Sequence, residues 1–351
     1  MTTSLELARA AYRGVSLYSV DSAPCAVDLS DNTNLWGSPP AARRVLRELA
    51  DDALARYPSA YASELKDALA EYAGVDPACI GTGCGSDDIL DSAIRAFAAP
   101  GDRIAFCAPT FAMIPIFARL NGVEPVAIPM TSSWDIDPDA LARADARVIY
   151  VCSPNNPTGT VASRGALDRL IASAPGVVLL DEAYAEFCAE SILDLAKASE
   201  RVLVSRTMSK AFGLAGLRVG YAVGAPSLIA EVEKSRGPYK VSTVAERAAV
   251  AALMHDRTWV AERVGAARAS RDRLATSLRA LGLAPLPSQA NFVFVPIADA
   301  PAVARRMRER GVAVRAFQGL PIVGDALRIT AGPDPMMEQG LDALAEALSC
   351  A

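Results

Sequence analysis

The chain of 351 residues has few of the side chains on which several enzyme classes depend. Histidine occurs once, at His255, in a Met-His-Asp-Arg stretch typical of a helix end. A Ser-His-Asp triad would have to use that residue, and a histidine-rich metal site is excluded. Acid–base chemistry therefore falls mainly to lysine, tyrosine, a carboxylate or a bound cofactor.

Long apolar runs and clusters of basic residues are also missing. No apolar stretch approaches the length that spans a bilayer, and the first twenty residues do not resemble a signal peptide. The net charge of -5 and the scattered basic residues argue against a nucleic-acid surface. Seven cysteines at unpatterned spacings indicate reduced thiols, most of them in the core. We therefore expect a cytoplasmic protein without a membrane or nucleic-acid partner.

Apolar residues make up 52% of the chain, enough for two domains. From residue 41 to about 240, apolar runs of strand length alternate with helical patterns, which indicates a mostly parallel sheet covered on both faces. We predict an α/β large domain at residues 41–242 with a seven-stranded sheet. Its strands are expected at Ala78–Gly81, Arg103–Ala108, Glu124–Pro129, Arg147–Cys152, Gly176–Leu180, Arg201–Val204 and Val219–Val223.

A different pattern begins near residue 243. A long helical stretch with a break near Asp256 leads into strands expected at Asn291–Ile297, Val312–Phe317 and Ala326–Ala331. Helical segments intervene and close the chain, so residues 243–351 are predicted to form a smaller α+β domain. Residues 1–40 are rich in turn formers and are expected to form an arm that joins the small domain.

Residues 201–220 hold the most informative pattern. An apolar strand is followed by hydroxyl side chains at Thr207 and Ser209, by Lys210 and, after two glycines, by Arg218. A partly buried lysine loses its proton readily and can hold an aldehyde cofactor as a Schiff base, while hydroxyls and an arginine bind its phosphate. For Ser-x-Lys taken alone, a plain loop lysine is by far the more common explanation, so the assignment depends on the rest of the chain.

Residues 81–88, Gly-Thr-Gly-Cys-Gly-Ser-Asp-Asp, follow a strand and open a helix. Exposed amides at a helix start bind phosphate, and glycine allows close approach. A dinucleotide site would need an acidic residue about twenty positions later, and residues 104–108 contain none. A phosphate at Ser86 and Asp87 would therefore use backbone amides and a cation such as Arg218; a capped glycine turn is the alternative.

Three more patterns follow expected strands. Two prolines bracket Asn155 and Asn156, so a stiff turn directs a carboxamide at a ligand. Asp181 emerges from an apolar strand, where a carboxylate needs a positive partner such as a protonated ring nitrogen, and Tyr184 follows it. A salt bridge or a helix cap is the plainer explanation for Asp181.

Two arginines of the small domain, Arg315 and Arg328, lie in or next to short strands expected to face the cleft. Arginine binds carboxylate or phosphate in bidentate geometry. A solvated strand face explains one such residue more easily than two.

Taken together and in order, these motifs resemble the fold-type I pyridoxal-phosphate enzymes, and among them the class I/II aminotransferases of histidinol-phosphate aminotransferase type. The resemblance spans nearly the whole chain. It rests on Asp-Asn-Thr-Asn-Leu-Trp-Gly (31–37), Arg-Tyr-Pro (56–58), Gly-Cys-Gly-Ser-Asp-Asp (83–88), Ala-Pro-Thr-Phe (108–111), Asn-Asn-Pro-Thr-Gly (155–159), Asp-Glu-Ala-Tyr (181–184), Arg-Thr-Met-Ser-Lys (206–210), Gly-Leu-Arg-Val-Gly (216–220) and Leu-Arg-Ile-Thr (327–330).

The resemblance implies pyridoxal 5'-phosphate as cofactor and a ping-pong transfer of an amino group to a 2-oxo acid such as 2-oxoglutarate. Lys210 would hold the cofactor and act as the base, and Asp181 would keep the pyridine nitrogen protonated. The remaining cofactor contacts it implies are Asn156 and Tyr184 at the ring hydroxyl, Phe111 on the ring face, and Ser86, Asp87, Thr207, Ser209, Arg218 and, from the neighbouring subunit, Tyr57 at the phosphate. Substrate contacts would be Tyr18, Asn34, Asn156, Arg315 and Arg328. The protein is thus expected to be a homodimer with shared active sites, to which the arm contributes.

One departure bears on the substrate. Relatives usually carry Asn-Glu-Asn-Pro-Tyr-Gly where this chain has Asn-Thr-Asn-Leu-Trp-Gly (32–37). Leu35 and Trp36 are expected to make the pocket more apolar, so the amino donor is histidinol phosphate or an aromatic or other amino acid. A decarboxylase of the threonine-phosphate decarboxylase type is the alternative, because such enzymes share these motifs. A non-catalytic cofactor-binding module ranks lower, since Lys210 is present, and a dinucleotide oxidoreductase lower still.

Overall fold

The computed structural model describes residues 7–17 and 24–349. Its larger sheet has seven strands in the order β2-β8-β7-β6-β5-β3-β4. Only β8 runs antiparallel to its neighbours, so the mostly parallel sheet expected from the sequence is confirmed. The strands are β2 (Ile80–Cys84), β3 (Arg103–Ala108), β4 (Glu124–Pro129), β5 (Val148–Cys152), β6 (Val177–Asp181), β7 (Val202–Thr207) and β8 (Val219–Gly224).

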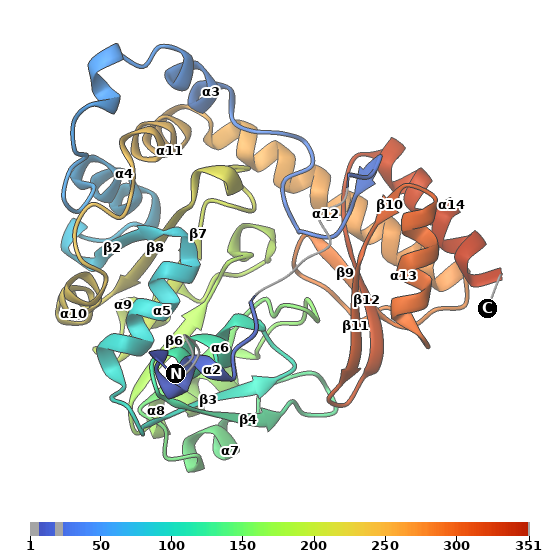
Figure 1. Cartoon of the computed structure of the whole chain (residues 1–351), viewed down its shortest axis with the longest axis horizontal. Coiled ribbons are helices and arrows are strands. Elements are labelled where there is room, and N and C mark those ends of the chain that lie inside the picture. The colour runs from blue at the N-terminus through green and yellow to red at the C-terminus, as the bar shows by residue number, and fades with distance from the viewer. Residues whose placement is uncertain (1–6, 18–23, 350–351) are drawn as a thin grey trace.

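Helices cover both faces of this sheet because its strands are apolar on both sides (Figure 1). On one face, α5 (Gly85–Phe97), α6 (Met113–Leu120) and α10 (Pro226–Arg236) supply a core that includes Ile89, Ile114 and Ile229. The opposite core is formed by α3 (Pro40–Arg47), α4 (Ser63–Ala73), α7 (Pro138–Arg143), α8 (Arg164–Ser173) and α11 (Thr243–His255). The sheet is thus buried, and its ligand-accessible edge is where the strands end.

A smaller antiparallel sheet, in the order β11-β12-β9, lies beside the large one. Its strands are β9 (Phe292–Pro296), β11 (Arg315–Leu320) and β12 (Gly324–Thr330), and it packs against α13 (Ala300–Glu309) and α14 (Asp334–Ser349). Within the predicted arm, β1 (Val27–Asp28) pairs with β10 (Val312–Ala313), and the bounds of the arm stay a prediction.

One long helix, α12 (Arg257–Ala280), connects the two parts, as Figure 1 shows. Val260 and Val264 belong to the large core, whereas Leu274 and Leu278 belong to the small one. The expected helix break is confirmed at Asp256, whose carboxylate accepts a hydrogen bond from the Ala41 amide at 2.8 Å. The domain boundary at residue 242 stays a prediction, and α11, which it assigns to the small domain, packs on α3 and α4.

Several strand ends differ from the expected ones, among them both ends of β2, and two of the differences have clear reasons. The strand expected over residues 312–317 divides at Val314, because β10 pairs with the arm whereas β11 pairs with β12. Strand β7 continues to Thr207 instead of ending at Val204, because its polar residues stay paired with β8. Within the described residues, no helix is long and apolar enough to cross a membrane.

Candidate active site

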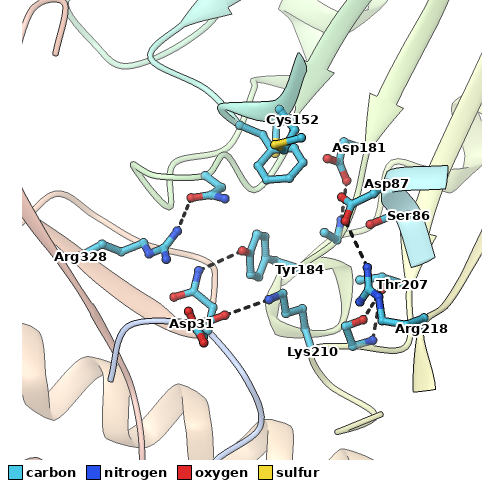
Figure 2. A pocket seen from close by; sticks show the side chains of 16 residues that line it. Asp31, Ser86, Asp87, Cys152, Asp181, Tyr184, Thr207, Lys210, Arg218 and Arg328 are labelled. Atoms are coloured by element: carbon cyan, nitrogen blue, oxygen red, sulfur yellow. Dashed lines mark hydrogen bonds and ion pairs between the residues drawn. The ribbon is translucent and has the colours of Figure 1, made fainter. Parts of the chain in front are cut away.

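A cavity of about 350 Å³ opens where β5, β6 and β7 end, between the large sheet and β12 (Figure 2). Parallel strands present their carboxyl ends at one edge, so side chains far apart in sequence meet there. The lining residues are Asp31, Asn32, Ser86, Asp87, Phe111, Met113, Cys152, Asn156, Asp181, Ala183, Tyr184, Thr207, Ser209, Lys210, Arg218 and Arg328.

Lys210 reaches into this cavity from the loop after β7. Its Nζ donates a hydrogen bond to the Asp31 carbonyl at 3.0 Å and lies 6.0 Å from the centre of the Tyr184 ring. Burial, with the positive charge of Arg328 as a further cause, lowers the Lys210 pKa to about 8. About a tenth of this amine is therefore neutral, and so nucleophilic, at pH 7, whereas an exposed lysine is almost wholly charged.

One end of the cavity suits a phosphate. Ser86 and Asp87 lie in the first turn of α5, where amides without intrahelical partners face outward. Arg218 lies beside them, with Nη2 3.1 Å from an Asp87 carboxylate oxygen. Gly85, at φ +82°, makes this approach possible, because a Cβ there would lie 2.6 Å from Arg218 Nη2.

Two hydroxyl groups complete that end. Thr207 Oγ1 donates to Ser209 Oγ at 3.0 Å and accepts from the Ser209 amide at 3.1 Å, so both side chains are held in place. Figure 2 shows Thr207 and Arg218 close together beside Ser86 and Asp87. A guanidinium, helix amides and hydroxyls together form an anion site.

Asp181 faces the cavity from the end of β6. Its Oδ2 accepts a hydrogen bond from the Tyr150 hydroxyl at 2.7 Å, and its Oδ1 accepts one from the Ala183 amide at 3.1 Å. Burial raises the Asp181 pKa to about 6, and these two hydrogen bonds oppose the rise. Such a carboxylate needs a positive partner from the cavity, as a protonated ring nitrogen would provide.

Tyr184 and Arg328 lie across the cavity from the anion site. The Tyr184 hydroxyl accepts a hydrogen bond from Asn32 Nδ2 at 3.0 Å, and burial raises its pKa to about 12. Arg328 donates to Asn156 Oδ1 at 2.5 Å and to the Ser30 carbonyl at 2.6 Å. Its guanidinium also lies 5.4 Å from the centre of the Phe292 ring, so the arginine is fixed before any anion arrives.

The structure gathers most of the predicted site residues around the cavity, but three described ones lie elsewhere. Asn34 Nδ2 donates to the Ala211 carbonyl at 2.9 Å, so this side chain supports the Lys210 loop and lines no part of the cavity. Arg315 pairs with Arg328 across β11 and β12 but is not a lining residue. Tyr57 is 85% exposed, and Tyr18 lies outside the described residues.

Sequence reasoning missed five lining residues, Asp31, Asn32, Met113, Cys152 and Ala183. Asn32 precedes the predicted Asn34 by two positions, and its left-handed φ of +55° turns its side chain towards Tyr184. Asp31 and Asn32 belong to the motif that resembles the family, so that motif was the available signal. Cys152 was predicted to lie in the core, and no sequence pattern indicated that Met113 would line a site.

These features fit pyridoxal phosphate. A glycine without a Cβ leaves space for Arg218 at a helix start, a buried carboxylate faces the cavity, and a lysine with a lowered pKa lies between them. The buried carboxylate thus suits the ring nitrogen of the cofactor, the helix start with Arg218 suits its phosphate, and the lysine suits its aldehyde. Among the described residues, no group of three or more His, Cys, Asp or Glu side chains could hold a metal ion.

Comparison with known proteins points the same way. A family model described as aminotransferase class I and II matches residues 25–344. The histidinol-phosphate aminotransferase of Roseiflexus castenholzii is 38% identical over 335 residues, covering 91% of this chain and 89% of that protein. The one from Thermobifida fusca is 38% identical over 338 residues, covering 92% and 91%. A crystal structure of histidinol-phosphate aminotransferase from Sinorhizobium meliloti in complex with pyridoxal-5'-phosphate superposes with a TM-score of 0.84, at 27% identity, over 93% of this chain and 92% of that one.

Proposed function

The chain belongs to the class I and II aminotransferases, and we propose that it transfers the amino group of histidinol phosphate to a 2-oxo acid such as 2-oxoglutarate. It has the fold of type I pyridoxal-phosphate enzymes, uses that cofactor and is a transaminase. The substrate proposal rests on the similar proteins reported above. They are histidinol-phosphate aminotransferases, and they match this chain along most of its length. Transamination is favoured over the decarboxylase alternative by the same relatives.

The predicted site residues that line the cavity each have a defined task in this proposal. When bound, pyridoxal phosphate supplies an electron-withdrawing ring that stabilises the negative charge left on the substrate's α-carbon. Lys210 holds the cofactor, and its neutral Nζ takes the proton from that carbon. Asp181 would keep the proton on the ring nitrogen, Asn156 and Tyr184 would bind the ring hydroxyl, and Phe111 would contact the ring.

The anion site binds the cofactor's phosphate through the amides of Ser86 and Asp87, the hydroxyls of Thr207 and Ser209, and Arg218. The fixed position of these groups supports this assignment, because a ligand that enters loses little freedom to the protein's own ordering. A phosphate held at one end also orients the ring over Lys210.

Arg328 binds the substrate's acidic group. It lies opposite the anion site and exchanges its bonds to Asn156 and Ser30 for bonds to the substrate's phosphate. The expected effect of Leu35 and Trp36 on the pocket is not supported, because neither residue lines it. Leu35 packs on the small core and Trp36 on the large one, so this departure from the family pattern is no argument against histidinol phosphate.

A homodimer and a cytoplasmic location are parts of the same proposal. The exposed ring of Tyr57 lies 5.1 Å from the ring of Tyr239, which is also exposed, so together they form an aromatic surface suited to a second copy. The cytoplasmic location is supported by the free cysteines at positions 25, 79, 84, 107, 152 and 188.

Steady-state kinetics with two donors tests the substrate. With 2-oxoglutarate as acceptor, kcat/KM is expected to be roughly 10²-fold or more higher for histidinol phosphate than for phenylalanine, because only the former offers a phosphate to Arg328. Arg328→Gln should remove most of that preference. A preference for phenylalanine would replace the proposed substrate by the aromatic alternative, and release of carbon dioxide from phenylalanine without an acceptor would contradict transamination.

A further inference from the structure

Tyr150 is a buried residue of β5 that does not line the cavity but contacts a residue that does. Its side chain is fully buried, and its hydroxyl donates to Asp181 Oδ2 at 2.7 Å. Strands β5 and β6 are parallel neighbours in which Cys152 pairs with Asp181 and Tyr150 with Leu179. The phenol therefore reaches along the sheet to the carboxylate that ends the next strand.

Among the described side chains, Tyr150 is the only hydrogen-bond donor to Asp181. Ser205 of β7 pairs with Asp181 across the two strands. Its buried hydroxyl has no hydrogen-bond partner in the described part of the chain, so it is not a second side-chain donor to Asp181. The second donor to Asp181 is the Ala183 amide, on the other carboxylate oxygen. The phenol and the amide thus fix the plane of the carboxylate and occupy one lone pair on each oxygen.

We propose that Tyr150 is a positioning residue that, through its hydrogen bond to Asp181, keeps the shared proton on the pyridine nitrogen of the bound cofactor. This inference rests on the proposed placement of that nitrogen against Asp181. A hydrogen bond to a carboxylate stabilises its charged form, so a donor lowers its affinity for the proton. Without the phenol, Asp181 becomes the stronger base of the pair, and the proton moves from the nitrogen towards the carboxylate.

The groups around Asp181 make the position of the shared proton sensitive to the loss of one hydrogen-bond donor. Burial raises the Asp181 pKa to about 6, so this carboxylate holds a proton more tightly than an exposed aspartate does. The charges of Asp87, from α5, and of Glu182, next in the chain, raise it further, and Cys152 of β5 faces it as a neutral thiol because burial raises the thiol pKa. Tyr150 stays protonated, because burial raises its own pKa well above the usual value. It can therefore act only as a donor towards Asp181.

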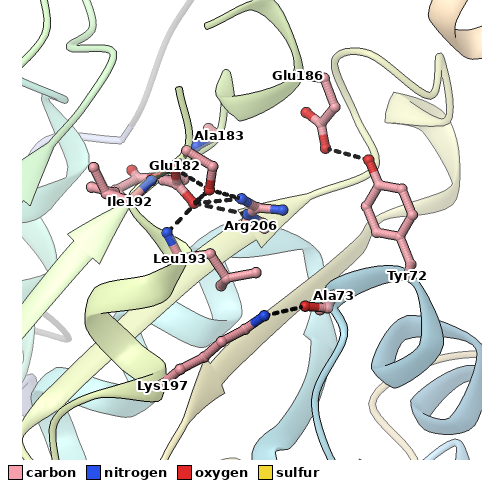
Figure 3. A network of polar contacts seen from close by, with 11 residues as sticks. Tyr72, Ala73, Glu182, Ala183, Glu186, Ile192, Leu193, Lys197 and Arg206 are labelled. Carbon is pink, nitrogen blue, oxygen red and sulfur yellow. Dashed lines mark hydrogen bonds and ion pairs between the residues drawn. The ribbon is translucent and has the colours of Figure 1, made fainter. Parts of the chain in front are cut away.

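The test uses Tyr150→Phe and a matched control, Tyr72→Phe. Tyr72 also donates its phenol to a carboxylate, Glu186 Oε1 at 3.4 Å, but away from the cavity (Figure 3). Each holoenzyme is loaded with pyridoxal phosphate labelled with 15N in the ring. The 15N resonance reports where the proton lies, and a loss of stability alone does not move it.

In Tyr150→Phe the resonance is expected to move towards the position of unprotonated pyridine, while Tyr72→Phe keeps the wild-type position. Because a charge-assisted hydrogen bond is lost, kcat should fall roughly tenfold, with a change of KM for the amino donor of less than about twofold. A wild-type resonance in Tyr150→Phe would overturn the proposal. If this variant does not fold, 3,5-difluorotyrosine replaces Tyr150, and separately Tyr72, in the otherwise unchanged chain. If fluorine at position 150 leaves the 15N resonance unchanged, the proposal for Tyr150 is overturned.

A third variant, Asp181→Ala, separates this inference from the function on which it rests. If Asp181→Ala moves the resonance and Tyr150→Phe does not, the carboxylate holds the nitrogen but the phenol is irrelevant. If neither moves it, the proposed placement of the cofactor ring against Asp181 is itself wrong.

Discussion

At the scale of single residues, the cavity shifts the pKa values of an amine and a carboxylate towards each other. Burial lowers the pKa of Lys210 to about 8 and raises that of Asp181 to about 6. Each shift disfavours a charge that water would otherwise stabilise. Both groups are therefore prepared for proton transfer near neutral pH, where an exposed lysine would be fully charged.

The first prediction concerns the pH at which the apoprotein takes up pyridoxal phosphate. Only the neutral amine of Lys210 attacks an aldehyde, so the uptake rate should rise with pH and reach half its maximum near pH 8. The charge of Arg328 contributes to the lowered pKa, so Arg328→Gln should move this midpoint to higher pH. Stopped-flow absorbance measures the rate. Arg201→Gln, a substitution of an arginine bonded to Ala174 outside the cavity, should leave the midpoint in place.

The second prediction concerns Gly85. Its φ of +82° strains any other residue, and a Cβ would lie 2.6 Å from Arg218 Nη2. Gly85→Ala should displace Arg218 from the anion site and weaken pyridoxal-phosphate binding by roughly tenfold or more, as measured by equilibrium titration of the apoprotein. Gly165→Ala is the control, because a Cβ there meets nothing within 4 Å. Equal affinities for the two variants would contradict the phosphate assignment.

At the scale of elements, a buried ion pair joins the ends of β6 and β7 (Figure 3). Arg206 donates to Glu182 Oε2 from Nε at 2.9 Å and from Nη2 at 2.7 Å, and Ser191 bonds both residues. Glu182 follows Asp181 in the chain, and Arg206 precedes Thr207. The pair thus holds in register the two strand ends that present the ring partner and a phosphate ligand.

The third prediction follows from the burial of that pair. Arg206→Met leaves Glu182 without its counter-charge and should lower the free energy of unfolding by about 3–5 kcal/mol. Replacing both residues, Glu182→Gln with Arg206→Met, should cost less than Arg206→Met alone, because no unpaired charge remains. Urea denaturation of the apoprotein measures these differences. Arg164→Ala breaks exposed pairs with Asp168 and Asp194 and should cost less than about 1 kcal/mol. If Arg206→Met lowers the free energy of unfolding by as little as Arg164→Ala does, the buried pair does not contribute to stability.

The elements themselves were largely predictable, because apolar strands and amphipathic helices leave a clear period in the sequence. Strands β3 and β4 have the expected bounds, and the helix break falls at Asp256. Strand ends set by pairing were not predictable: nothing local at Val314 shows that the chain changes partners there.

The same limit applies within the site. Lys210, Asp181 and Arg218 follow or precede strands, so the topology alone brings them together. That Asn32 faces Tyr184 while Asn34 supports the Ala211 carbonyl depends on one left-handed φ. The Tyr150 phenol lies within a continuous apolar strand, and its contact with Asp181 depends on the register of β5 against β6.

At the scale of the whole molecule, the fourth prediction concerns the proposed dimer. If Tyr57 serves the neighbouring subunit's cavity, one site of a mixed dimer can be intact although both subunits are defective. Mixing Lys210→Ala subunits with Tyr57→Ala subunits should therefore restore activity to roughly a quarter of the wild-type value, since about half of the random dimers are mixed and each has one intact site. Unmixed samples are the controls. Activity that does not rise on mixing would place Tyr57 outside the partner's site.

The central claim is that Lys210 binds pyridoxal phosphate and that the bound cofactor accepts an amino group from histidinol phosphate. The most direct test is the visible absorption spectrum of the purified protein with pyridoxal phosphate, recorded before and after histidinol phosphate is added without an acceptor. If Lys210 holds the cofactor, we expect a visible band that is absent in Lys210→Ala, that fades with the donor and that returns when 2-oxoglutarate is added. A band that is unchanged in Lys210→Ala, or that no amino donor diminishes, would contradict the claim.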